Sequence, residues 1–313
     1  TLDTNGKTIT LTGAITNKSN TIITGNGTID YPTATDAVKT IINSNGTLTI
    51  NNSTLKSNAR FIALISDGTI NVNGGTYVVN ASTCSSGCSP FTLSGGIVNI
   101  NGGTYQGDKL NYLVINSGGT VNFGETKAIT ISGFPFWNNS GTINFKQGTL
   151  KDVSTGVTLK GGNLNISGGS IIASDTGISA TSGTVNITGG TISGGATGVA
   201  IGEGSGSPTL NITGGSITGT NYTGVYIASG TVTLGQKDGS VSTISPKIYS
   251  NNYALMNNGG TWNFYDGVLY GPKKYSGSLS ASESGYSIKS DVDSTYGYKS
   301  YLSNKYILTV KNG

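Results

Sequence analysis

Few side chains in this sequence could carry acid–base or nucleophilic chemistry. The 313-residue chain has one arginine, Arg60, no histidine and only 14 acidic residues. The acids are spread along the chain: Asp3, Asp30, Asp36, Asp67, Asp108, Glu125, Asp152, Asp175, Glu203, Asp238, Asp266, Glu283, Asp291 and Asp293. Hydrolysis of a glycosidic bond needs two carboxylates at a defined separation, and histidine is the commonest general base. We therefore predict no catalytic residue, no cofactor and no metal site.

The two cysteines, Cys84 and Cys88, lie close together in the phrase TCSSGCSP. We interpret them as a short disulfide loop, because a metal site would need further cysteine or histidine ligands. A disulfide would place the protein outside a reducing cytosol. The sequence contains no signal peptide and no apolar run long enough to span a membrane. We expect a piece of a longer secreted protein.

Composition favours a folded, repetitive β protein. The chain holds 50 glycines and only 10% charged residues, and valine and isoleucine recur at regular intervals, unlike in disordered chains. Its net charge of +4 is small and dispersed, so we predict no nucleic-acid partner.

A repeat of about 22 residues organises the chain. The phrase SGTVNITGGTI at Ser182–Ile192 returns as GTINVNGGTY from Gly68 and PTLNITGGSI from Pro208. The polar residue at the centre of each phrase defines twelve anchors: Thr10, Asp30, Thr49, Asn71, Asn99, Asn122, Asn144, Asn165, Asn186, Asn211, Thr233 and Asn263. Apolar residues flank each anchor, and glycine pairs follow where the chain must turn.

Short alternating strands joined by tight corners predict a right-handed parallel β-helix over residues 1–270, with about 12 coils of ~22 residues each. One polar column should face outward as a ladder: Asn71, Asn99, Asn122, Asn144, Asn165, Asn186, Asn211 and Asn263. A second lies six residues before the anchor and could turn inward: Asn43, Asn116, Asn138 and Asn257. Inward amides would bond to one another or to turn backbone.

The period ends near Tyr270, and residues 271–313 are rich in tyrosine and lysine. An open solenoid end exposes its core and unpaired strand edges, so we expect a C-terminal cap or small β appendage there. Exposed tyrosines in this segment could stack on sugars or dock a partner. The candidates for such contacts are Tyr296, Tyr298, Tyr301 and Tyr306.

The phrase LDTNGKTIT at Leu2–Thr10, the repeated SGT-apolar-Asn-apolar motif and the closing SGYSIKSDVDSTYGYKSYL resemble Gram-positive-type bacterial surface proteins. These adhesin-like proteins carry pectate-lyase-like β-helix regions. The resemblance covers nearly the whole chain, and it implies a secreted or cell-surface location. Pectate lyases use clustered acids for calcium and a basic residue for proton removal, and the acids of this chain occupy different repeat positions.

We expect an extracellular, non-catalytic structural or adhesive protein, a stiff shaft that could contact host or cell-wall glycans or surface proteins. A polysaccharide lyase or glycoside hydrolase is the first alternative. A filament-forming or tail-spike-like fibre is the second, because solenoid ends can associate. Ice binding is a more remote alternative, because flat threonine-rich faces of β-solenoids occur in ice-binding proteins.

Overall fold

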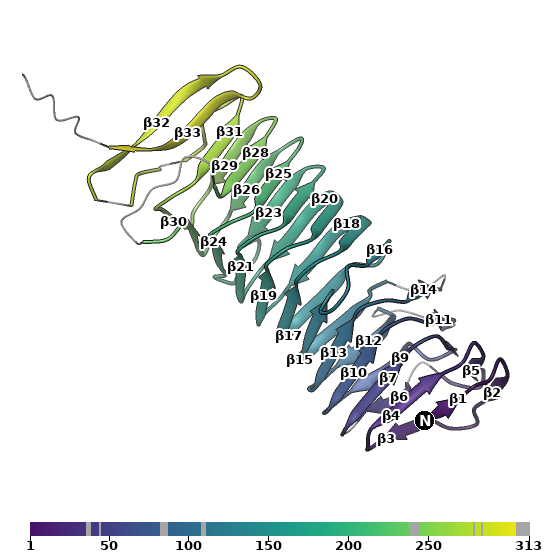
Figure 1. Cartoon of the computed structure of the whole chain (residues 1–313). Helices are drawn as coiled ribbons and strands as arrows, with labels where there is room; N and C mark the ends of the chain where they lie inside the picture. The colour runs from purple at the N-terminus through teal and green to yellow at the C-terminus, as the bar shows by residue number, and fades with distance from the viewer. Residues whose placement is uncertain are drawn as a thin grey trace, which may run out of the picture.

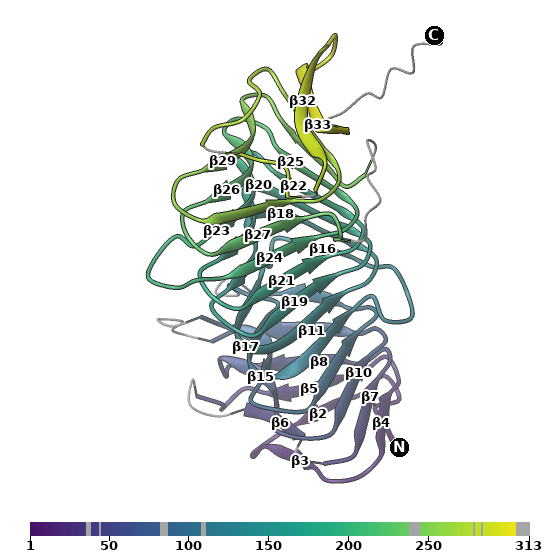
Figure 2. The same ribbon diagram turned by 90° about the vertical axis from the view of Figure 1, so that its left-hand side faces the viewer.

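The computed structural model is an all-β parallel solenoid of about 11 turns with about 22 residues per turn (Figure 1). It describes residues 1–35, 39–43, 45–81, 87–107, 111–237, 245–277, 279–282 and 284–304. Figures 1 and 2 show an elongated stack, with the N-terminus at one end and a β-hairpin at the other. At about 4.8 Å per turn the stack is about 50 Å long.

Each turn contributes a strand to three faces, which we name the ladder face, the split face and the third face. The strands of the ladder face pair in parallel in this order: β1 (Leu2–Asp3), β4 (Thr21–Thr24), β7 (Thr47–Ile50), β10 (Thr69–Val72), β13 (Ile97–Ile100), the second half of β15 (Val114–Phe123), the second half of β17 (Phe136–Phe145), β19 (Asn163–Ile166), β21 (Thr184–Ile187), β24 (Thr209–Ile212), β27 (Thr231–Leu234) and β30 (Thr261–Phe264).

The split face consists of two stacks. The first is the five-stranded sheet β2 (Thr8–Thr10), β5 (Thr28–Tyr31), β8 (Thr54–Ser57), β11 (Thr76–Val79) and β14 (Thr104–Gln106). The second runs through β16 (Thr130–Ser132), the first parts of β18 (Thr149–Leu159) and β20 (Ser170–Ala180), β22 (Thr191–Gly194), β25 (Ser216–Gly219), β28 (Lys247–Ser250) and β31 (Val268–Gly271).

The third face closes the triangle. Its strands are β3 (Ile15–Asn17), β6 (Lys39–Asn43), β9 (Phe61–Ile65), β12 (Ser89–Leu93), the first parts of β15 and β17, the second parts of β18 and β20, β23 (Thr197–Ile201), β26 (Thr223–Ile227) and β29 (Tyr253–Asn257).

The core forms from equivalent apolar residues stacked turn upon turn. Val185 and Ile187, for example, are fully buried on either side of Asn186. Aromatic side chains fill the middle turns: the rings of Phe123 and Phe145 stack with centroids 4.4 Å apart, and Phe136 meets Phe123 edge-on at 5.5 Å. Burial of these columns is the main source of stability, because a single turn cannot bury its own apolar side.

Glycine at the corners allows the turns to stack closely. Gly190 has a φ of 79°, and a Cβ placed on it would lie 2.8 Å from the carbonyl oxygen of Gly168 in the preceding turn. Both the left-handed backbone and the close approach therefore require glycine at this corner.

The first two of the twelve anchors lie on a different face from the other ten. Thr10 and Asp30 pair with each other on the split face, and Asp30 then pairs with Lys56. Thr49 instead pairs with Ile22 on the ladder face. The first two anchors were thus assigned to the wrong face, because both faces carry the same threonine–apolar–polar–apolar alternation.

A hairpin packs on the last turn at the C-terminal end. It is formed by β32 (Tyr286–Asp293) and β33 (Gly297–Asn304), and β33 pairs antiparallel with β31. Leu302 is buried against the solenoid core, and Ile288 is partly buried beside it. Residues 305–313 lie outside the described part of the chain.

Candidate functional site

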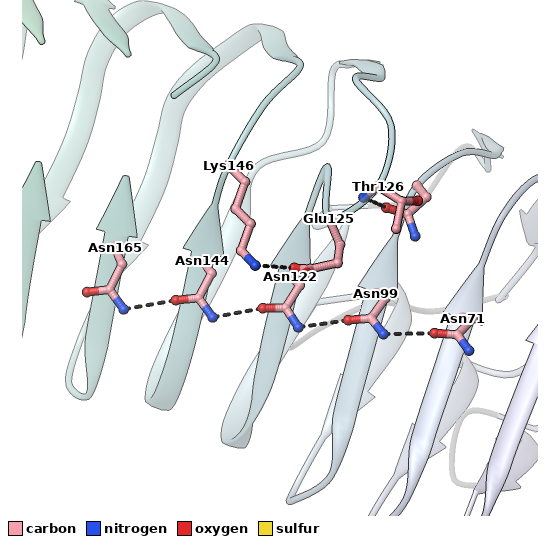
Figure 3. Close-up of polar contacts among 9 residues, drawn as sticks. Asn71, Asn99, Asn122, Glu125, Thr126, Asn144, Lys146 and Asn165 are labelled. Carbon is pink, nitrogen blue, oxygen red and sulfur yellow. Dashed lines mark hydrogen bonds and ion pairs between the residues drawn. The ribbon is translucent and has the colours of Figure 1, made fainter. Parts of the chain in front are cut away.

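The most regular surface feature is a ladder of asparagine amides on the ladder face (Figure 3). Each Nδ2 donates to the Oδ1 of the equivalent residue in the preceding turn, over 2.7 to 2.9 Å. Seven asparagines join in this way: Asn71, Asn99, Asn122, Asn144, Asn165, Asn186 and Asn211. The amide N–H groups therefore all point toward the N-terminal end of the solenoid.

Threonine occupies the same column at both ends of the ladder. Asn71 donates to the hydroxyl of Thr49 over 3.5 Å, and Asn263 donates to the hydroxyl of Thr233 over 3.4 Å. Asn263 thus lies in the predicted column but is separated from Asn211 by Thr233. Amides and hydroxyls can bind and align, but neither is a strong base, so this surface offers hydrogen bonding without proton transfer.

The predicted inward asparagines lie inside the third face. Asn43, Asn116 and Asn138 are completely buried, and Asn257 is half-buried near the C-terminal end. The amide of Asn116 donates to Oδ1 of Asn138 over 2.8 Å and to the carbonyl of Gly119 over 3.0 Å. The oxygen of Asn116 accepts the backbone N–H of Gly119 over 2.9 Å. These buried amides satisfy corner backbone that would otherwise lack partners.

A fifth inward asparagine, Asn17, was missed from the sequence. It is 6% exposed, pairs in register with Asn43, and donates to its Oδ1 over 2.7 Å. Counting the first turn from Thr10, on the split face, hid this relation. Even counted from Ile22, which shares the column of Thr49, the offset of six residues falls on Thr16, because the corner after Asn17 is one residue shorter than the corner after Asn43.

Two of the described acidic residues pair with lysines of the next turn. Glu125 pairs with Lys146 over 2.5 Å (Figure 3), and Asp30 pairs with Lys56 over 3.5 Å. Within the described ranges, no three His, Cys, Asp or Glu side chains lie close enough together to hold a metal ion. Four of the acids considered above lie outside those ranges: Asp36, Asp108, Asp238 and Glu283.

Of the two cysteines in the predicted Cys84–Cys88 disulfide, the structure describes only Cys88. Cys88 is buried directly before β12, and its backbone N–H donates to Oδ1 of Asn111 over 3.1 Å. Cys84 lies outside the described residues, so the bond stays a prediction.

Three tyrosines form a cluster where the hairpin meets the split face. The rings of Tyr249 and Tyr270 stack with centroids 4.9 Å apart, and the ring of Tyr296 tilts against them at 5.1 and 5.3 Å. Burial raises the pKa of both Tyr249 and Tyr270. Tyr296 itself is 37% exposed and lines a hollow of about 300 Å³ beside Pro272.

Tyr298 and Tyr301 contact charged side chains of the hairpin and of the segment before it. Lys274 lies over the ring of Tyr298 at 5.4 Å. The hydroxyl of Tyr301 donates to Asp291 over 2.6 Å, and Lys299 lies over its ring at 5.2 Å. Tyr306 lies outside the described residues. Of the three predicted contact tyrosines that the structure describes, Tyr296 is the most exposed.

An aromatic platform on the third face was not anticipated. Trp137 projects from β17, and the ring of Tyr112 lies 5.3 Å from it. The indole N–H donates to Asn139 over 2.8 Å, which fixes the ring orientation, and the Lys160 ammonium lies 5.6 Å from the ring centre. The signal was a tryptophan at an outward position of an alternating strand.

Comparisons with protein-family models, with curated proteins and with solved structures found no match to this chain. In the part of the chain that the structure describes, no helix has the length and apolar character needed to cross a membrane.

Proposed function

We propose that this chain is a stiff extracellular shaft of an adhesin-like bacterial surface protein, which holds glycan-contacting surfaces at fixed spacing. The amide ladder is the observation that carries the proposal. Its side-chain hydrogen bonds link seven turns, and they supplement the backbone hydrogen bonds of the sheets. Such a ladder resists bending and shear between turns, which is the property required of a shaft.

The aromatic side chains supply the adhesive part of the proposal. The Trp137 platform and the Tyr296 cluster lie on different faces and near different levels of the stack, so one shaft presents two separate contacts. Aromatic rings with a polar edge suit partners that are apolar on one side and hydroxylated on the other, as sugars are. The resemblance to bacterial surface proteins supports the cell-surface setting.

The C-terminal hairpin argues against end-to-end growth at that end. Its outer strand, β32, carries Lys289 and Asp291 as an ion pair over 3.2 Å, and charges on an edge strand oppose pairing with another chain. We therefore favour the shaft over the filament.

Retention of the protein on immobilised bacterial and host polysaccharides tests the adhesive function. We expect retention that falls when Trp137 and Tyr296 are both changed to alanine, while Asn163→Ala, on the exposed surface of β19, leaves it unchanged. Failure of the wild-type chain to bind any polysaccharide or cell-wall preparation would refute the adhesive role.

A further inference from the structure

The split face is interrupted at one level of the stack. Strands β14 and β16 belong to consecutive turns, yet in the described pairings β14 joins only β11 and β16 joins only β18. The corner that leads into β16 explains the break. It takes seven residue steps from Phe123 to Thr130, against four from Phe145 to Thr149 in the next turn. The longer corner displaces β16 from β14.

A cavity of about 200 Å³ lies at this break. Tyr105, Ile131 and Phe134 supply apolar surface, with Tyr105 and Ile131 buried to 8% and 2% exposure. Exposed hydroxyl side chains on β14 and β16 surround the cavity, including Thr104 and Ser132. The site therefore has an apolar floor and a hydrogen-bonding rim.

A β-bulge in the next strand brings a carboxylate to this rim. Leu150 pairs with Ile171 and Val153 with Ala173, so β18 holds one residue more than β20 between these pairs. Asp152 adopts a φ of 57°, one of two positive values among the described non-glycine residues. Bulges of this kind redirect side chains and are frequent beside binding sites.

The redirected carboxylate contacts the cavity lining directly. Ser132 donates its hydroxyl to Oδ2 of Asp152 over 2.6 Å. The Lys151 ammonium lies 3.7 Å from the same oxygen. The rim thus combines a hydroxyl, a carboxylate and an ammonium within one small area, and the two charges offset each other.

We propose that this cavity binds one neutral sugar unit, with its apolar face against Tyr105 and Phe134 and its hydroxyls on Asp152 and Lys151. The cavity of about 200 Å³ is smaller than sites for drug-sized ligands, which occupy roughly 300–1,000 Å³, so its size fits a single sugar ring. Because the charges of Asp152 and Lys151 offset each other, the rim suits the hydroxyl groups of a neutral ligand better than an ionic ligand. This inference rests on the proposed glycan-contacting function and assigns it a defined site, separate from the Trp137 platform.

Titration with single sugars by saturation-transfer NMR and calorimetry tests the site, with glucose, galactose, mannose and N-acetylglucosamine as probes. A ligand of this size should bind with a Kd on the order of 1 mM. Asp152→Asn keeps a residue that tolerates positive φ and should weaken binding about tenfold or more, as should Asp152→Gly. Glu203→Gln removes one charge from an exposed loop elsewhere and should leave the affinity unchanged.

Thermal unfolding of each variant, run in parallel, separates loss of binding from loss of fold. Equal affinity of wild type and Asp152→Asn for every sugar, or no binding of any of the four by the wild type, overturns the site. The adhesive shaft survives that result if the wild type is still retained on polysaccharide, and it falls if retention is also absent. Release of cleaved product from a glycoside would overturn the assignment of a binding-only site.

Discussion

Replacing Asn165 with alanine should destabilise the solenoid measurably, because Asn165 lies in the middle of the amide ladder. Its Nδ2 donates to Asn144 and its Oδ1 accepts from Asn186, each over 2.9 Å. A net hydrogen bond contributes about 0.5–1.5 kcal/mol, so two contribute about 2 kcal/mol. The ladder is half-buried, so water can partly replace the lost partners. We therefore expect the free energy of unfolding to fall by about 1.5 kcal/mol.

The matched control is Asn163→Ala, two residues earlier on the same strand and the same outward side. Asn163 is exposed and shows no side-chain hydrogen bond among the described contacts, so its change should stay within about 0.5 kcal/mol. Unfolding all 313 residues in one transition has an entropy of about 0.66 kcal/mol/K, at about 2.1 cal/mol/K per residue. Dividing the loss of about 1.5 kcal/mol by this entropy predicts that Asn165→Ala lowers Tm by about 2 °C. Differential scanning calorimetry and guanidinium unfolding measure both variants. Indistinguishable values for the two would show that the ladder contributes nothing to stability.

The remaining predictions concern a corner and the hairpin. Gly190→Ala should lower the free energy of unfolding by about 2 kcal/mol or more, because the position combines a positive φ with a carbonyl oxygen too close to the new Cβ. Gly13→Ala, with open space around the residue, should be nearly neutral. Equal denaturation midpoints for the two variants would contradict the requirement for glycine at this corner. The hydrogen bond from Tyr301, together with the nearby lysine, lowers the pKa of Asp291, so the stabilisation is present above the ordinary value near 3.8 and is lost as pH falls through the lowered pKa. Hydrogen exchange of the hairpin amides should show wild type better protected than Tyr301→Phe at pH 6 and the difference shrinking below pH 4; a pH-independent difference would rule out this linkage.

The fold could be predicted because packing imposes the repeat on the sequence. The columns around Asn186 recur in turn after turn, and stacked turns bury each apolar column above its equivalent. The first two anchors failed for a physical reason. Thr10 and Asp30 lie in strands with the same alternation as the ladder strands, and alternation reports which side of a strand is buried but not which face it joins.

The cavity beside β16 and the bulge at Asp152 were harder to foresee. The three extra residues before Thr130 hardly change the repeat length, because the corner from Ile131 to Phe136 is two residue steps shorter than the corner from Leu150 to Val157. The cavity arises from that local compensation. The bulge at Asp152 is likewise hard to recognise, because it involves a single residue in a repeat whose length varies from turn to turn. Its effect depends on where Ser132 lies in three dimensions.

The central claim is that this shaft binds glycans without cleaving them. The most direct test incubates the protein with a panel of bacterial and host polysaccharides, with and without calcium, and measures retention and newly formed chain ends on the same samples. We predict retention of the protein by at least one polysaccharide with no increase in reducing ends or unsaturated products. Release of such products in proportion to protein concentration would contradict the account.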